Sequence, residues 1–152
     1  MKITIACIGR SRDGAMKALF EDYARRIPWP VALKELEEKR PLPAAQRMER
    51  EAALLRAALP AKAKIIALDE RGKAMASSVF AEQLGRWQDD GVPEIGFIIG
   101  GADGLDPALR KEAALILSFG AMTWPHLLVR VLLAEQLYRA HTILTGHPYH
   151  RE

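Results

Sequence analysis

The sequence predicts an α/β fold in which helices flank a mostly parallel sheet. Apolar segments rich in β-branched residues alternate along the chain with segments of helical spacing. The apolar segments are hydrophobic throughout, which is typical of strands buried on both faces of a parallel sheet. No repeat, low-complexity stretch or linker divides the chain, so residues 1–152 are expected to form a single domain.

Five segments carry the strand pattern: KITIACIG (2–9), VALKEL (31–36), KIIALD (64–69), EIGFII (94–99) and LILSF (115–119). The expected helices cover residues 11–26, 44–59, 77–89, a stretch from 107 and 125–144. DERGK (69–73) is typical of a turn after the third strand. Ser77 or Ser78 is expected to cap the third helix, and Asp106 followed by Pro107 is typical of a helix start.

The composition is that of a small globular protein. Hydrophobic residues make up 49% of the chain, and the net charge of +3 is too small to demand a nucleic-acid partner. The one cysteine, Cys7, lies in an apolar segment, which indicates a core residue and a reducing compartment. No stretch approaches the ~18 apolar residues of a membrane span and no signal peptide is recognisable, so we expect a cytoplasmic protein with no membrane partner.

Missing motifs exclude several large enzyme classes. The first strand is not followed by the G-x-G-x-x-G of dinucleotide-binding folds. The chain has neither a G-x-x-x-x-G-K-[ST] phosphate loop nor a G-x-S-x-G nucleophile elbow. The four histidines have no cysteine pair and no H-x-x-x-H spacing, so no metal site is expected.

Three strand ends carry unusual sequences: ALDERGK (67–73), IIGGADGLDP (98–107) and SFGAMTWPH (118–126). Ligands bind at the carboxyl ends of the strands in open α/β sheets, so these segments are the expected binding site. Gly100, Gly101 and Gly104 either let the backbone approach a ligand closely or only make a sharp turn. The sequence leaves both interpretations open.

The segment 125–144 is hydrophobic around most of a helical circumference. A helix of this kind is buried on more than one side, which indicates a partner and most simply a second copy of the chain. Its few charges, Arg130, Glu135 and Arg139, fit salt bridges about as well as substrate binding.

The chain closes with HPYHRE (147–152), a cluster of hydrogen-bonding side chains where chains usually fray. Together with LDERGK, FIIGGADGL and LSFGAMTWPHLLVRVLLAEQLYRAHTIL, this tail resembles the small SPOUT methyltransferases of bacterial large-subunit ribosomal RNA. The resemblance spans the chain. It is most specific in the C-terminal half and loose between Pro28 and Ala63.

The resemblance implies S-adenosylmethionine as cofactor, a deep trefoil knot in the C-terminal part of the fold, and a homodimer. It places the cofactor pocket on the three strand ends. Gly120 stands where the family often carries serine, so only a backbone contact is expected there. The implied cofactor-binding residues are Leu68, Gly100, Phe119, Gly120, Ala121, Met122, Thr123 and Trp124.

The implied activity is methylation of N3 of a pseudouridine in 23S ribosomal RNA. Methyl transfer from a sulfonium is catalysed mainly by holding N3, the methyl group and the sulfur in line. The pseudouridine must also lose its N3 proton. In the family the tail of one subunit reaches the pocket of the other. The implied catalytic residues are Arg139, His147, Tyr149, His150 and Arg151. Which of them takes the proton stays open, as does deprotonation by solvent.

The implied partner is ribosomal RNA within the assembled ribosome. Basic residues between Arg10 and Arg50 are candidate phosphate contacts, and Tyr149 and Trp124 are candidates for stacking on a base. Two alternatives stay open. One is a SPOUT methyltransferase that acts on another RNA, and the other is a non-catalytic module that binds an adenosyl ligand or the ribosome.

Overall fold

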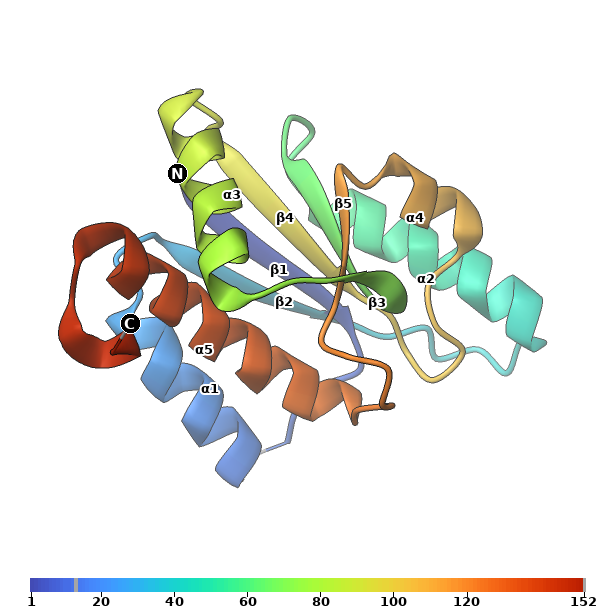
Figure 1. Ribbon diagram of the computed structural model, residues 1–152. Coiled ribbons are helices and arrows are strands. Elements are labelled where there is room, and N and C mark those ends of the chain that lie inside the picture. The colour runs from blue at the N-terminus through green and yellow to red at the C-terminus, as the bar shows by residue number, and fades with distance from the viewer. Residues whose placement is uncertain (13, 152) are drawn as a thin grey trace.

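The computed structural model describes residues 1–12 and 14–151. Strands and helices alternate along these residues, as the sequence predicts (Figure 1). The strands are β1 (Lys2–Ile8), β2 (Val31–Leu36), β3 (Lys64–Ala74), β4 (Glu94–Ile99) and β5 (Leu115–Ser118). The helices are α1 (Ala15–Arg26), α2 (Ala44–Ala58), α3 (Ser77–Asp89), α4 (Pro107–Glu112) and α5 (His126–Thr145), followed by a 3₁₀ turn, η1 (Pro148–His150).

The strands form one sheet in the order β2-β1-β4-β3-β5, and each neighbouring pair is parallel. In β1, Ile5 lies opposite Leu33 of β2 and Phe97 of β4. The carboxyl ends of all five strands therefore meet at one edge of the sheet. The α/β fold class with a parallel sheet is confirmed.

Helices cover both faces of the sheet (Figure 1). Successive side chains of β1 point to opposite faces, so Ile5 packs with α1, α3 and α5 while Ala6 packs with α2 and α4. Cys7 lies on the α5 side, where burial raises the pKa of its thiol to about 11. It is a core residue, as the sequence indicates.

The long helix α5 lies between α1 and α3 on the sheet (Figure 1). Leu133 and Leu137 are fully buried, whereas Leu144 at its end is exposed. The chain itself thus covers most of the apolar circumference of α5, so this feature does not by itself require a second copy. No helix in the described part of the chain is long and apolar enough to cross a membrane.

The turn expected at DERGK does not end the third strand. Leu68 of β3 pairs with Leu117, and pairing with β5 resumes at Lys73 after an irregular stretch. A turn-like bond persists inside that stretch, because the Asp69 carboxylate accepts the N–H of Arg71 at 2.9 Å. The prediction of a turn that ends the strand is wrong, because β3 runs through DERGK to Ala74 with an irregular register.

Two helix starts also differ from expectation. Ala76 is the N-cap of α3 and no side chain caps it; the Ser77 hydroxyl instead donates to Gln136 of α5 at 2.7 Å. α1 begins at Ala15 rather than at residue 11, and residue 13 within the expected span lies outside the described residues. Asp106 does cap α4, accepting N–H bonds from the first turn.

The deep trefoil knot that the family resemblance implies for the C-terminal part of the fold stays a prediction.

Candidate active site

A cavity of about 290 Å³ opens at the carboxyl ends of β3, β4 and β5. Its walls come from the end of β3, the loop between β4 and α4, the loop between β5 and α5, and the first turns of α5. Ala121, one of the expected cofactor-binding residues, is not among the lining residues. The other expected residues all line it: Leu68, Gly100, Phe119, Gly120, Met122, Thr123 and Trp124.

The loop after β4 folds so tightly that its glycines contact one another. A Cβ atom on Gly100 would lie 2.9 Å from the carbonyl carbon of Gly104. Gly104 has a φ of +83° and donates its N–H to the Gly101 carbonyl at 3.0 Å. The sharp turn accounts for the glycines at 100 and 104, and this turn presents bare backbone to the cavity.

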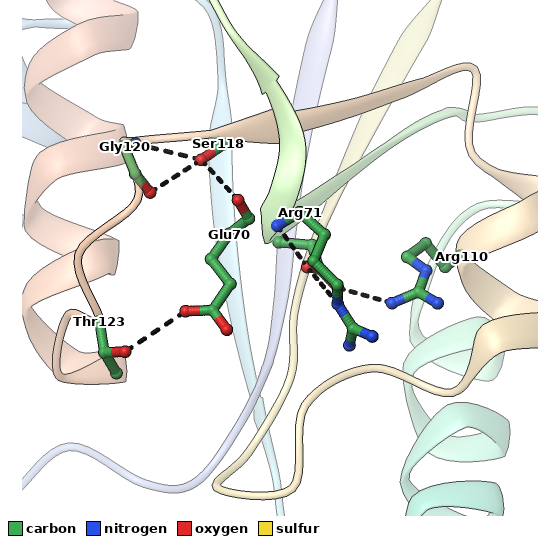
Figure 2. A network of polar contacts seen from close by, with 7 residues as sticks. Glu70, Arg71, Arg110, Ser118, Gly120 and Thr123 are labelled. Carbon is green, nitrogen blue, oxygen red and sulfur yellow. Dashed lines mark hydrogen bonds and ion pairs between the residues drawn. The ribbon is translucent and has the colours of Figure 1, made fainter.

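Ser118 joins two walls of the cavity (Figure 2). Its buried hydroxyl lies 3.1 Å from the carbonyl oxygen of Glu70 and 3.0 Å from that of Gly120, and it accepts the Gly120 N–H at 3.1 Å. The Thr123 hydroxyl donates to the Glu70 carboxylate at 3.3 Å. These contacts connect the end of β3 to the loop that follows β5, so the two walls are held in register.

Several charged side chains line the cavity. They are the carboxylates of Asp69, Glu70 and Asp103 and the guanidinium of Arg71, and Asp103 is paired with Arg47 at 3.2 Å. Burial raises the pKa of Asp69, but hydrogen bonds from the Arg71 backbone and from Arg110, 3.1 Å away, outweigh it and hold that pKa below its usual value (Figure 2). Arg71 and Arg110 balance Asp69, and Arg47 balances Asp103, so the described lining carries no large excess of negative charge.

His126 lines the same cavity at the start of α5. Its Nε2 would lie 3.3 Å from a Cβ on Gly9, whose φ of +95° also favours glycine. Arg130, one turn further on, is only 2% exposed and donates to the carbonyls of Ile8 and Gly9 at 3.0 and 2.8 Å and to Glu35 at 3.2 Å. Burial, and then the charge of Arg130, lower the pKa of His126, which favours the neutral imidazole.

The tail lies at the opposite end of α5 from the cavity (Figure 1). Gly146 ends the helix with a φ of +70°, and the chain turns back along it. The Tyr149 hydroxyl donates to Glu135 at 3.1 Å, and its ring lies 4.6 Å from that of Tyr138. Burial raises the pKa of Tyr149, and a hydrogen bond with Tyr23 and the charge of Glu135 raise it further.

The remaining tail candidates also contact their own chain. Arg139 bonds Glu135 at 2.6 Å, which confirms the salt-bridge interpretation without excluding a second role. His147 accepts the Tyr149 N–H on Nδ1 at 3.2 Å, and a ring nitrogen of His150 lies 3.3 Å from the Thr142 hydroxyl. Arg151 has a left-handed φ of 51°. None of the five expected catalytic residues lines the cavity of its own chain: Arg139, His147, Tyr149, His150 and Arg151.

A family model described as "Predicted SPOUT methyltransferase" matches residues 1–150. The chain belongs to the SPOUT methyltransferase family. Two relatives bear the name "Ribosomal RNA large subunit methyltransferase H": that of Paramagnetospirillum magneticum is 56% identical, and that of Rhodospirillum centenum 51% identical, each over 99% of both chains. The SpoU methyltransferase AviRb from Streptomyces viridochromogenes, solved in complex with AdoMet, matches 92% of this chain and 58% of its own at 14% identity and a TM-score of 0.49.

In this SPOUT methyltransferase the three segments that line the cavity were predicted from the sequence, but two of its titratable side chains, His126 and Glu70, were not predicted as site residues. His126 was considered only as a metal ligand, although it closes the segment SFGAMTWPH that marked the third strand end. Glu70 lies in DERGK, which was interpreted only as a turn. Both residues are titratable side chains within the three strand-end segments, and that is the sequence signal that marks them.

Proposed function

We propose that the protein transfers a methyl group from S-adenosylmethionine to N3 of a pseudouridine in 23S ribosomal RNA, within assembled ribosomes and thus in the cytoplasm. The observation that carries this proposal is the full-length match to relatives named as large-subunit ribosomal RNA methyltransferases. The cavity supports it, because the loops that the sequence assigned to the cofactor meet there.

The cavity residues fit such a cofactor. Leu68, Phe119 and Trp124 offer apolar walls for an adenosine, and the turn at Gly100 offers unobstructed backbone. The Glu70 carboxylate on the cavity wall suits a ligand that carries a sulfonium charge. The lowered pKa of His126 disfavours a positive charge on this wall that would oppose the sulfonium.

The bound cofactor supplies an electrophilic methyl group. The chain has to hold the two reactants in line, exclude water and remove the N3 proton. Ser118 and its contacts with Glu70 and Gly120 keep the cavity walls in register, which serves the first of these tasks. The buried contacts of Arg130 fix the start of α5 against β1 in the same way.

A homodimer is part of the proposal. α5 has 20 residues, about 30 Å of helix, and the cavity and the tail lie at its two ends. A tail that is held at the far end of its own helix is available only to the cavity of another copy. Met16 and Leu19 on α1 are exposed apolar side chains beside that helix and are candidates for the contact.

Two experiments test the proposed function. Calorimetric titration with S-adenosylmethionine, with NAD as control, should show saturable binding of the sulfonium alone. Mass spectrometry of ribosomal RNA from a strain that lacks the gene should show loss of one methylated pseudouridine, which the purified protein restores on whole ribosomes. Methylation of a different RNA would favour the first alternative. Cofactor binding with no methylated product would favour a non-catalytic module.

A further inference from the structure

His126 is a titratable side chain of the cavity to which the proposed function gives no role. It is the first residue of α5 and shares the cavity lining with Trp124 and Val129. Unlike the tail, it belongs to the same chain as the cofactor-binding loops. It therefore lies at the site whether or not a second copy is bound.

The surroundings of His126 keep a lone pair on its imidazole. Arg130 is fixed one turn away by two backbone carbonyls and by Glu35, so its positive charge cannot move aside. The N-terminal end of α5 adds partial positive charge at the same place. Both disfavour an imidazolium, as does burial, and the pKa of His126 is lowered accordingly.

The tail offers poorer proton acceptors. Arginine stays protonated in proteins, which removes Arg139 and Arg151. Tyr149 would have to be ionised to accept a proton, and its raised pKa opposes that. One ring nitrogen of His147 already accepts a backbone N–H, and His150 is engaged with Thr142.

We propose that His126 is the proton acceptor for the target base, while the tail binds and orients the nucleotide. This inference rests on the proposed function. The unprotonated ring nitrogen takes the N3 proton, and the electron pair of the N–H bond stays on N3. That pair forms the new N–C bond as the S–C bond breaks, and the electrons of the S–C bond stay on sulfur. His126 then gives its proton to water.

Other charged groups around His126 set the form of its pH dependence. Arg130 lies on its own helix, and Glu35 of β2 lies behind Arg130. A further group of charged residues lines the same cavity: Asp69, Glu70 and Arg71 of β3, and Asp103 of the loop after β4. Among these influences, burial and then the charge of Arg130 dominate and lower the pKa of His126.

The test compares His126→Asn with His141→Asn. Both histidines lie on α5, but His141 packs edge-on against Trp29 at 5.8 Å, away from the cavity. We expect His126→Asn to lower kcat on ribosomes by about 100-fold while KM and cofactor affinity change by less than about threefold. The wild-type rate should fall as pH drops through the pKa of His126, and this acid limb should vanish in His126→Asn but persist in His141→Asn.

Two measurements separate this role from a structural one. NMR titration of the cofactor-free protein should show a histidine signal, absent from His126→Asn, that titrates below pH ~6.5. Added imidazole should restore part of the turnover of His126→Ala, because a free base can occupy the space left by the side chain.

A His126→Asn enzyme that keeps its kcat and its acid limb would overturn the inference, and so would one that only loses cofactor affinity. If His126→Asn does not fold, an unchanged acid limb in His126→Gln or a lack of imidazole rescue in His126→Ala would overturn it instead. Failure of the proposed function looks different, because then the wild-type protein itself neither binds the cofactor nor methylates ribosomes.

Discussion

The two ends of α5 are built in different ways. At its N-terminal end, a segment of β3 and the loops that follow β4 and β5 meet around a cavity, and hydrogen bonds from Ser118 and Arg130 fix the walls to the sheet. At its C-terminal end, Tyr149 contacts Glu135 and Tyr138, and His150 contacts Thr142, all of them side chains of α5 itself. The cavity follows from the topology of the sheet, whereas the tail is held by a few local contacts.

This difference indicates a division of labour. Residues that shape a binding cavity gain from a rigid sheet, since small displacements weaken every contact to a ligand. A segment that must reach another molecule gains from contacts that are few and easily exchanged. In the proposed dimer each end of α5 supplies half of the active site, the cavity end from one copy and the tail end from the other.

Removal of the tail should have the largest effect on turnover. A chain truncated after Gly146 loses the candidate tail residues but keeps every residue that lines the cavity. We expect methylation of ribosomes to fall by about 1000-fold, because donors and positioning groups are lost together. S-adenosylmethionine affinity, measured by calorimetry, should stay within a few-fold of wild type.

A Gly100→Leu change at the cavity end of α5 should have the converse effect: it should weaken cofactor binding and leave the tail intact. A side chain at this position meets the Gly104 backbone at 2.9 Å, so the turn must open. An overpacking cost of about 2–3 kcal/mol corresponds to roughly 100-fold weaker cofactor binding, measured by the same titration. Gly91→Leu is a control for backbone strain away from the cavity, because its φ is +73° and nothing lies within 4 Å of its Cβ position, whereas Gly100 has no positive φ. Equal losses of affinity in the two variants would mean that general destabilisation of the fold, rather than the crowded turn at Gly100, is responsible.

Mixing these two inactive chains sharpens the comparison. The truncated chain has an intact cavity, and the Gly100→Leu chain has an intact tail. If the tail acts across the dimer, mixed dimers contain one complete site and activity returns on mixing. If both halves must come from one chain, the mixture stays as inactive as either variant alone.

The same contrast explains what the sequence could predict. The strands and the cavity loops follow from apolar runs and from glycines, which are local signals, and their convergence follows from the geometry of parallel sheets. The start of α4 was predicted to the residue, because Asp106 and Pro107 carry the cap in their own side chains. Contacts between distant segments left no local signal. Ser77 looks like a cap but bonds Gln136, which is 59 residues away.

The surface of α5 shows a second limit. Its apolar circumference predicted a helix buried on several sides, and that is correct. Periodicity does not say what covers each side, and α1 and α3 of the same chain cover most of it. The tail differs from α5, because its proposed role depends on contact with a second copy of the chain. The sequence pattern of one chain does not predict where that copy binds.

The smallest predicted effect is on the free energy of unfolding, and it should differ in sign between two carboxylates, Glu135 near the tail and Glu51 near the cavity. Glu135, at the tail end, accepts bonds from Arg139 and Tyr149. Glu51 of α2 is only 6% exposed, and its Oε2, which lies behind the turn at Gly101, has no hydrogen-bond partner among the described residues. Burial, and then the charge of Asp103, raise the pKa of Glu51.

The raised pKa fixes the sign of the effect on stability. The folded protein holds the Glu51 proton more tightly than the unfolded chain does, so this contribution is fully present below the unfolded pKa and is lost as pH rises through the folded pKa. Glu51→Gln has no charge to bury and should raise the free energy of unfolding by about 1 kcal/mol at pH 8. Denaturant titrations should show this gain shrinking to near zero at pH 4. Glu135→Gln should instead lower stability at pH 8, because it weakens charge-assisted bonds. A Glu51→Gln protein that is less stable than wild type at both pH values would show that the carboxylate has a native partner after all.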